Sequence, residues 1–115
     1  MHSKTKACQI SKATREKVYL RDGCHCVLCG KWADVSNACA HFIPRSRGGL
    51  GIEQNILTLC HDCHYKYDND NKETTRKQKE DYFREYLRSK YDDWSEEALE
   101  YDKWRFFKTG EKVKG

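Results

Sequence analysis

The chain has 115 residues, of which 37% are hydrophobic and 35% charged, and it carries a formal net charge of +4 at pH 7. This length suits one domain, residues 1–115, whose small core would need a metal or disulfides as a staple. No stretch approaches the ~18 apolar residues of a membrane span or resembles a signal peptide, so we expect a cytoplasmic protein without membrane contact. The basic charge permits a polyanionic partner and is equally ordinary for a soluble protein.

The N-terminal part predicts a mobile start followed by a helix. Residues 1–10 show no apolar periodicity, whereas 11–23 have helical spacing. Ser11 suits the N-cap, Val18 belongs to the apolar face, and Gly23 suits the C-terminal stop. We therefore expect a helix that leads into the first cysteines.

The middle of the chain predicts two short strands and a loop. The segment "ACAHFI" (38–43) reads as one strand, and "NILTL" (55–59), rich in β-branched residues, as the second. A proline and three glycines between them predict an irregular loop. A short helix is expected to open at the second cysteine pair, "CHDCHYKYDN".

The C-terminal part predicts helices rich in aromatic residues. Apolar spacing favours a helix over 72–94, and Ser95 could cap another, followed by a disordered tail. The aromatic residues and leucines of this part have two interpretations, a core that wraps the smaller unit or a partly exposed platform for a partner protein. They are Tyr82, Phe83, Tyr86, Leu87, Tyr91, Trp94, Leu99, Trp104, Phe106 and Phe107.

The seven cysteines predict a metal site. Their odd number excludes complete internal disulfide pairing, and reduced thiols in the cytosol favour metal binding. Cys26 and Cys29 form one C-x-x-C pair, and Cys60 and Cys63 form another. Four thiolates from two such pairs close a tetrahedral shell around a structural Zn²⁺, with no open position for substrate. Cys24 could compete with Cys26 for the metal, but its spacing to Cys29 suits a metal site less well.

The cysteines belong to a larger set of motifs. In chain order these are "RDGCHCVLCGK", "AHFIPRSRGG", Asn55 and "LCHDCH". The set resembles the HNH nuclease family, especially small phage and prophage proteins, over residues 14–70. The resemblance implies an α+β fold: a zinc-stapled, treble-clef-like ββα-metal unit. Helices would wrap this unit from the N-terminal side and from a C-terminal extension over 72–107.

The resemblance also implies a catalytic site. His41 matches the general base, Asn55 the residue that braces the loop and the base, and His64 a ligand of a catalytic divalent ion such as Mg²⁺, Mn²⁺, Ni²⁺ or Zn²⁺. The family usually has aspartate or histidine before the base as another ligand, where this chain has Ala40. Asp68, four residues after His64 on the expected helix, could replace it. Cys39 and His61 are weaker substitutes.

The resemblance implies DNA as the partner and hydrolysis of its phosphodiester bonds as the reaction. Arg45, Arg47 and Lys66 could hold backbone phosphates, although solvated side chains would explain them as well. The basic residues of 1–21, including Arg15, could form a phosphate-facing surface or a solvated helix face.

Two other functions stay open at this stage. The chain could be a non-catalytic zinc module that binds DNA or protein on a degenerate HNH scaffold, for which Ala40 is the main support. It could also be a component of a phage packaging or recombination machine, active alongside partner proteins. The sequence does not determine its oligomeric state.

Overall fold

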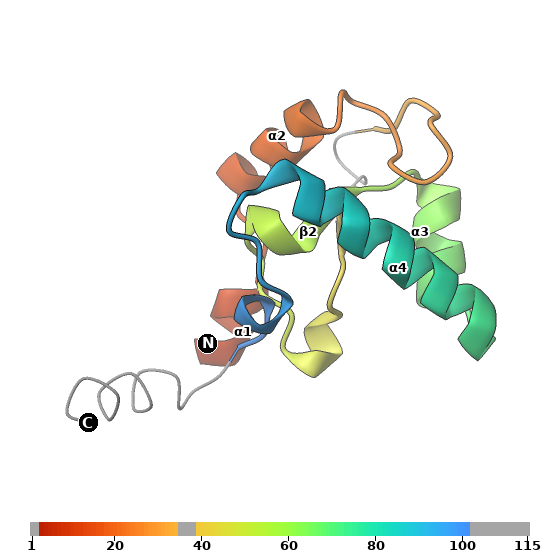
Figure 1. The fold of residues 1–115 in the computed structure, drawn as a ribbon. Helices are drawn as coiled ribbons and strands as arrows, with labels where there is room; N and C mark the ends of the chain where they lie inside the picture. The colour runs from red at the N-terminus through yellow and green to blue at the C-terminus, as the bar shows by residue number, and fades with distance from the viewer. Residues whose placement is uncertain (1–2, 35–38, 102–115) are drawn as a thin grey trace.

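The computed structural model of this chain describes residues 3–34 and 39–101, with backbone alone for residues 3 and 4. A small two-stranded sheet lies among the helices (Figure 1). In chain order the elements are α1 (Ser3–Cys8), α2 (Lys12–Arg21), β1 (Cys39–His41), the 3₁₀ turns η1 (Arg45–Arg47) and η2 (Glu53–Asn55), β2 (Ile56–Thr58), α3 (His61–Asp68), α4 (Glu73–Lys90) and the 3₁₀ turn η3 (Glu96–Leu99).

The two strands form the centre of the fold. They pair antiparallel, with Ala40 opposite Leu57 and His41 opposite Ile56. All three residues of β2 are buried, whereas in β1 only Ala40 is buried and its two neighbours are half-buried. One side of β1 therefore faces the core, and Cys39 and His41 remain available to a site.

Helix α2 forms as the sequence predicts. The Ser11 side chain accepts a hydrogen bond from the Thr14 backbone at 3.1 Å and caps the first turn. Val18 is fully buried against the sheet side, and the Arg21 guanidinium donates to the backbone carbonyl of Ile56 at 2.7 Å. These contacts fix α2 relative to β2.

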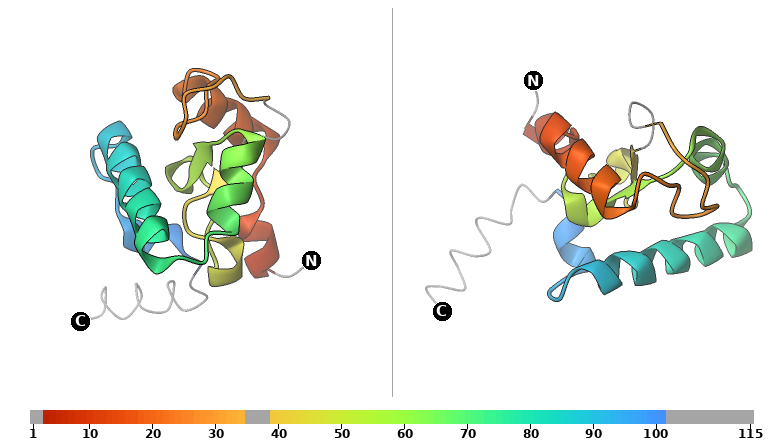
Figure 2. Two further views of the ribbon diagram at one scale, coloured as in Figure 1. Left: turned by 90° about the vertical axis from the view of Figure 1, so that its right-hand side faces the viewer. Right: turned by 90° about the horizontal axis from the view of Figure 1, so that it is seen from above.

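Helix α4 runs along one side of the molecule, from α3 to the C-terminal end of α2, where the Tyr86 hydroxyl donates to Asp22 (Figure 2). Phe83 and Leu87 are the fully buried residues of α4, and Phe83 packs edge-on against Tyr67 of α3 with ring centroids 5.1 Å apart. These contacts favour the core interpretation for this part of the aromatic set. Trp104, Phe106 and Phe107 lie outside the described residues.

Two predicted elements are wrong. Residues 3–8 form α1 rather than a mobile start, because Cys8 is 2% exposed and the Gly51 amide donates to the Ala7 carbonyl at 3.0 Å. The helix expected after Ser95 is only the turn η3, and the Ser95 side chain makes no capping bond. The following backbone pairs instead with the loop after η1: the Tyr101 amide donates to the Gly48 carbonyl at 2.6 Å.

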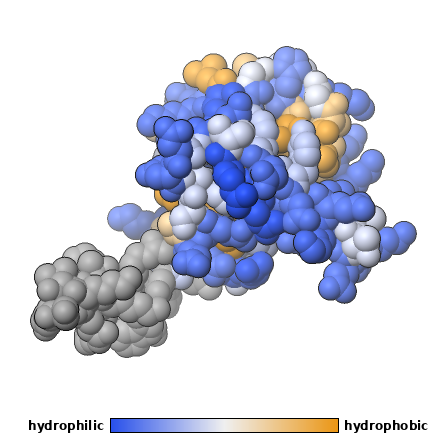
Figure 3. Space-filling view, in the orientation of Figure 1, coloured by the Kyte–Doolittle hydropathy of each residue, from blue (hydrophilic) through white to orange (hydrophobic). Residues whose placement is uncertain are grey.

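Hydrophilic side chains dominate the face that α4 crosses, with smaller hydrophobic patches among them (Figure 3). Five large hydrophobic residues are exposed in the described part of the chain: Leu20, Trp32, Ile52, Tyr65 and Tyr82. None of the helices described is long and apolar enough to span a membrane.

Candidate functional site

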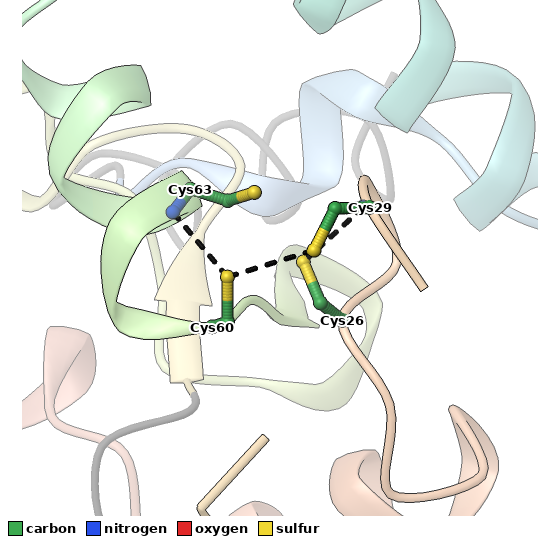
Figure 4. A group of neighbouring side chains, drawn as sticks. All are labelled: Cys26, Cys29, Cys60 and Cys63. Carbon is green, nitrogen blue, oxygen red and sulfur yellow. Dashed lines mark hydrogen bonds between the residues drawn. The ribbon is translucent and has the colours of Figure 1, made fainter. Parts of the chain in front are cut away.

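The two cysteine pairs converge as their spacing predicts. Cys26 and Cys29 lie in the loop after α2, and Cys60 and Cys63 lie at the N-terminal end of α3. The four sulfur atoms all lie within 4.8 Å of one another, and Figure 4 shows the side chains facing a common centre. Cys60 is the N-cap of α3 and its sulfur accepts from the Cys63 amide at 3.5 Å, so the local helix start helps to place both thiols.

The electrostatics of this cluster favour a bound cation. Burial raises the pKa of Cys26, but backbone and thiol hydrogen bonds outweigh it and lower that pKa to about 7. Burial and the neighbouring thiols raise the pKa of Cys63 well above its ordinary value. One thiolate thus opposes ionisation of the next, and a divalent cation would relieve this repulsion. Four cysteine sulfurs at these separations could hold Zn²⁺.

The other cysteines lie apart from this cluster. Cys8, Cys24 and Cys39 are free thiols and none joins the group of four, so Cys24 does not replace Cys26. Over residues 3–34 and 39–101, the four cysteines form the one group of three or more His, Cys, Asp or Glu side chains close enough to hold a metal ion.

A cavity of about 400 Å³ opens beside β1 and contains the histidines expected to be catalytic. It is formed where α2, β1, η1 and α3 meet. Its lining residues are Ile10, Arg15, Cys39, His41, Pro44, Arg45, His64, Tyr67 and Asp68. Residues far apart in the sequence thus bring two imidazoles, one carboxylate and two guanidinium groups to one place.

His41 is held in this cavity by a backbone group from the N-terminal segment. Its Nε2 lies 2.9 Å from the carbonyl oxygen of Cys8, which can only accept, so Nε2 carries a proton. In the neutral ring the other nitrogen, Nδ1, is then the proton acceptor. Burial lowers the pKa of His41 below its ordinary value, and the charges of Arg45 and His64 act in the same direction. Neutral imidazole is therefore the favoured form near pH 7.

His64 and Asp68 lie on the same face of α3. Their separation of four residues places His64 Nε2 3.2 Å from Asp68 Oδ2. Two neighbouring ligands of an octahedral ion at 2.0–2.1 Å lie about 3 Å apart, so this pair fits a shared divalent ion. An imidazole and a carboxylate also suit Mn²⁺, Ni²⁺ or Zn²⁺.

Ala40 faces away from this cavity. It is 2% exposed and belongs to the hydrophobic core with Leu57, whereas its neighbours Cys39 and His41 line the cavity. In a strand successive side chains point to opposite sides. A ligand at position 40 would thus point into the core of this chain, and its absence leaves no gap in the cavity wall.

Asn55 is fully buried at the end of η2 and ties the loop back to β1. Its Oδ1 accepts from the Ile43 amide at 2.8 Å, and its Nδ2 donates to the carbonyls of Ile43 and Leu50 at 3.2 and 2.8 Å. The Asn55 carbonyl accepts from the Phe42 amide at 2.8 Å, next to His41. The side chain therefore braces the loop that follows His41 and does not enter the cavity.

The three basic residues expected at DNA occupy different places. Arg45 lines the His41 cavity. Arg47, also on η1, forms an exposed ion pair with Glu100 at 3.3 Å. Lys66 lies on α3 but faces a groove between α3 and α4 that it shares with Tyr65 and does not reach the cavity.

Sequence reasoning missed what the N-terminal segment contributes to the cavity. Ile10 and the Cys8 carbonyl come from the segment expected to be mobile, and a backbone carbonyl leaves no signal in a sequence. Arg15 was among the basic residues expected on a phosphate-facing surface or a solvated helix face, and the structure places it in the cavity. Lys17 is two residues further along α2, so helical spacing places it on a different face from Arg15, where it pairs with Glu53.

The fold and this geometry define a ββα-metal unit: two antiparallel strands, a following helix, and a four-cysteine cluster at its base. A family model described as HNH endonuclease matches residues 26–70 of the chain, which contain both strands, α3 and all four clustered cysteines. The resemblance to the HNH family inferred from the motifs is thereby confirmed, and α1, α2 and α4 lie outside the matched segment.

Among curated proteins, Anaredoxin of Nostoc sp. (strain PCC 7120 / SAG 25.82 / UTEX 2576) is 43% identical to this chain over 42 residues. The similar segment is 36% of this chain and 54% of Anaredoxin, so the chain matches about half the length of that relative. No solved structure matches the chain significantly.

Proposed function

We propose that this chain is a metal-dependent endonuclease that hydrolyses phosphodiester bonds in DNA. The observation that carries the proposal is the convergence of His41, His64 and Asp68 on one cavity inside an HNH-matched segment. Each of the three side chains then has a chemical role that suits its surroundings.

His41 acts as the general base. With Nε2 donating to the Cys8 carbonyl, Nδ1 is free to accept a proton from a water molecule that attacks the phosphorus atom. Its lowered pKa keeps it neutral and able to accept at pH 7. Asn55 supports this role indirectly, because it fixes the backbone on both sides of the loop after His41.

His64 and Asp68 hold the catalytic divalent ion. When bound, such an ion would supply positive charge that stabilises the negative charge developing on the phosphate and the leaving 3′ oxygen. Asp68 would also orient the His64 ring, since the two side chains already contact each other. The four clustered cysteines hold a separate structural Zn²⁺ that fixes the start of α3, and with it His64.

The resemblance to small phage and prophage proteins extends the proposal to its setting. The chain would act on DNA in the cytoplasm of a host cell, where thiols stay reduced, and could work alongside packaging or recombination proteins.

Cleavage of supercoiled plasmid in the presence of Mg²⁺, Mn²⁺, Ni²⁺ or Zn²⁺ tests this function. We expect nicking by the native chain and a loss of at least about 100-fold in His41→Ala, the usual contribution of a general base. His64→Ala should also lose activity. His61→Ala is the matched control, because His61 is exposed on the same helix and does not line the cavity.

The same assay separates the proposal from a non-catalytic zinc module. A chain that binds plasmid in a mobility-shift gel but leaves it uncut with every ion would be such a module. Nicking that persists unchanged in His41→Ala would remove the assignment of the base.

A further inference from the structure

Two arginines from separate elements line the His41 cavity. Arg15 lies at the end of the first turn of α2, and Arg45 in η1 in the loop after β1. Arg15 is half-buried and Arg45 is exposed. Both line the same cavity as His41, and neither has been given a role as base or metal ligand.

These two arginines differ from the others that the structure describes. Arg21, Arg47, Arg76, Arg84 and Arg88 each form an ion pair with an aspartate or glutamate. Across residues 3–34 and 39–101, neither cavity arginine forms such a pair.

The charge of the cavity therefore suits an anion. The one carboxylate in its lining, Asp68, contacts His64 and does not pair with either arginine. When both histidines are neutral, the guanidinium charges outnumber this carboxylate. Arg45 acts on His41 electrostatically and helps to lower its pKa, after the larger effect of burial, which places its charge close to the base.

The position of Arg15 is fixed by its helix. Val18 is fully buried one turn later, and the Arg21 guanidinium bonds to backbone carbonyls of η2 and β2. Because the helix is anchored, only the side chain of Arg15, and not its backbone, has to be ordered when a ligand binds. Its planar fork of N–H donors matches two oxygens of a phosphate.

We propose that Arg15 and Arg45 form a phosphate subsite in the His41 cavity that holds the DNA backbone at the position of cleavage. Arg15 is the member that the HNH-matched segment does not contain, because that segment begins at residue 26. The identity of the anion as a DNA phosphate rests on the proposed function. The presence of an anion subsite rests on the two arginines alone.

Binding measured without cleavage tests the subsite. The zinc-loaded full chain is titrated against a short fluorescent DNA duplex with no other divalent ion, over a series of salt concentrations. We expect Arg15→Ala to weaken binding about tenfold, the usual effect of losing a hydrogen bond to a charged group. The slope of log K against log salt concentration should fall by about 0.9, as expected for one lost phosphate contact.

Lys17→Ala is the matched control, because Lys17 carries the same charge on the same helix but points away from the cavity towards Glu53. It should leave the slope nearly unchanged. Arg15→Lys should keep the slope and recover only part of the affinity. If Arg15→Ala binds with the affinity and slope of Lys17→Ala, the assignment of Arg15 is overturned.

A second variant protects the test against misfolding. Arg45 is exposed on a turn, so Arg45→Ala should have the melting temperature of the native chain. It should lose as much DNA affinity and salt dependence as Arg15→Ala. If neither arginine variant alters binding, the subsite does not exist. If both weaken binding but the native chain cuts no plasmid with any ion, the subsite stands and the endonuclease function fails.

Discussion

At the scale of single residues, the protonation of His41 controls the proposed reaction. Burial lowers its pKa below the ordinary value of ~6.5, and the Arg45 and His64 charges add to this effect. A lowered pKa means that the ring loses its proton at a lower pH, so the base is already neutral at pH 7. We therefore predict that kcat/KM is constant near pH 7 and falls only below about pH 6.5.

A variant at Arg45 checks the sign of this prediction. Removing its positive charge should raise the pKa of His41, so the acid limb of the pH profile should move to higher pH in Arg45→Ala. The position of the limb is read independently of the absolute rate. A native acid limb that lies above pH 7, or one that does not move in this variant, would contradict the assigned base.

Asp68 carries the second prediction at this scale. If it shares a divalent ion with His64, Asp68→Asn should raise the Mn²⁺ or Mg²⁺ concentration that gives half-maximal cleavage by about 10–100-fold. The control is Asp62→Asn, because Asp62 is exposed in the first turn of α3, outside the cavity. An unchanged ion requirement in Asp68→Asn would show that Asp68 only contacts His64.

Residue types and their spacing in the sequence predicted much of the candidate site. Helical spacing alone placed Asp68 beside His64, and the paired cysteines converged as their motif predicts. The partner of His41 could not be predicted, because it is a backbone carbonyl supplied by a segment with no apolar pattern. The orientation of Ala40 also depends on which side of β1 meets the core, and this is a property of the assembled fold.

At the scale of elements, α1 completes the site although it lies outside the HNH-matched segment. Gly51 is the point of contact: a Cβ atom there would overlap the Gln9 carbonyl oxygen, one residue from the Cys8 carbonyl that holds His41. Gly51→Ala should therefore push this segment away. We predict a loss of cleavage and a destabilisation of about 1–3 kcal/mol, typical of overpacking.

Urea unfolding and plasmid nicking of the same preparation measure both effects. Ile52→Ala is the control, since Ile52 is the adjacent residue and is 37% exposed. Native activity in a folded Gly51→Ala variant would mean that the contact between α1 and His41 is dispensable.

The predicted and observed helices show which elements local sequence signals can predict. Apolar spacing located α2 and α4, and the second cysteine pair located the start of α3, whose N-cap is Cys60. The capping signal at Ser95 was misleading, because backbone pairing with Gly48 and Leu50 draws the chain into an extended form after a single turn. Both α1 and this segment are determined by long-range contacts, which short-range periodicity does not contain.

At the scale of the whole molecule, a network of polar side chains connects the HNH-matched unit to the added helices. Arg21 donates to the Glu53 carbonyl at 2.9 Å and to the Tyr91 hydroxyl at 3.0 Å, and the Tyr86 hydroxyl donates to Asp22 at 2.6 Å. Burial and this hydrogen bond raise the pKa of Tyr86, which keeps it a donor. The network holds α2, η2 and α4 together around a small apolar core.

A core this small should depend on the metal at the cysteine cluster. The cysteine cluster joins the loop after α2 to the start of α3. Cys26 belongs to the main apolar cluster, and Cys60 and Cys63 pack against it. Metal binding to such a site is coupled to folding. We predict that the purified chain holds one equivalent of Zn²⁺ and that Cys63→Ser lowers both zinc content and melting temperature, with loss of nicking.

Cys24→Ser is the matched control, because Cys24 is a free thiol next to the cluster in sequence but does not belong to it. It should keep the zinc and the melting temperature of the native chain. The His64→Ala variant should also keep its zinc while losing nicking, since the cysteine sulfurs alone complete the shell. This pattern would assign stability to the cysteine cluster and chemistry to the His41 cavity. Native zinc content and melting in Cys63→Ser would instead show that the fold stands without the metal.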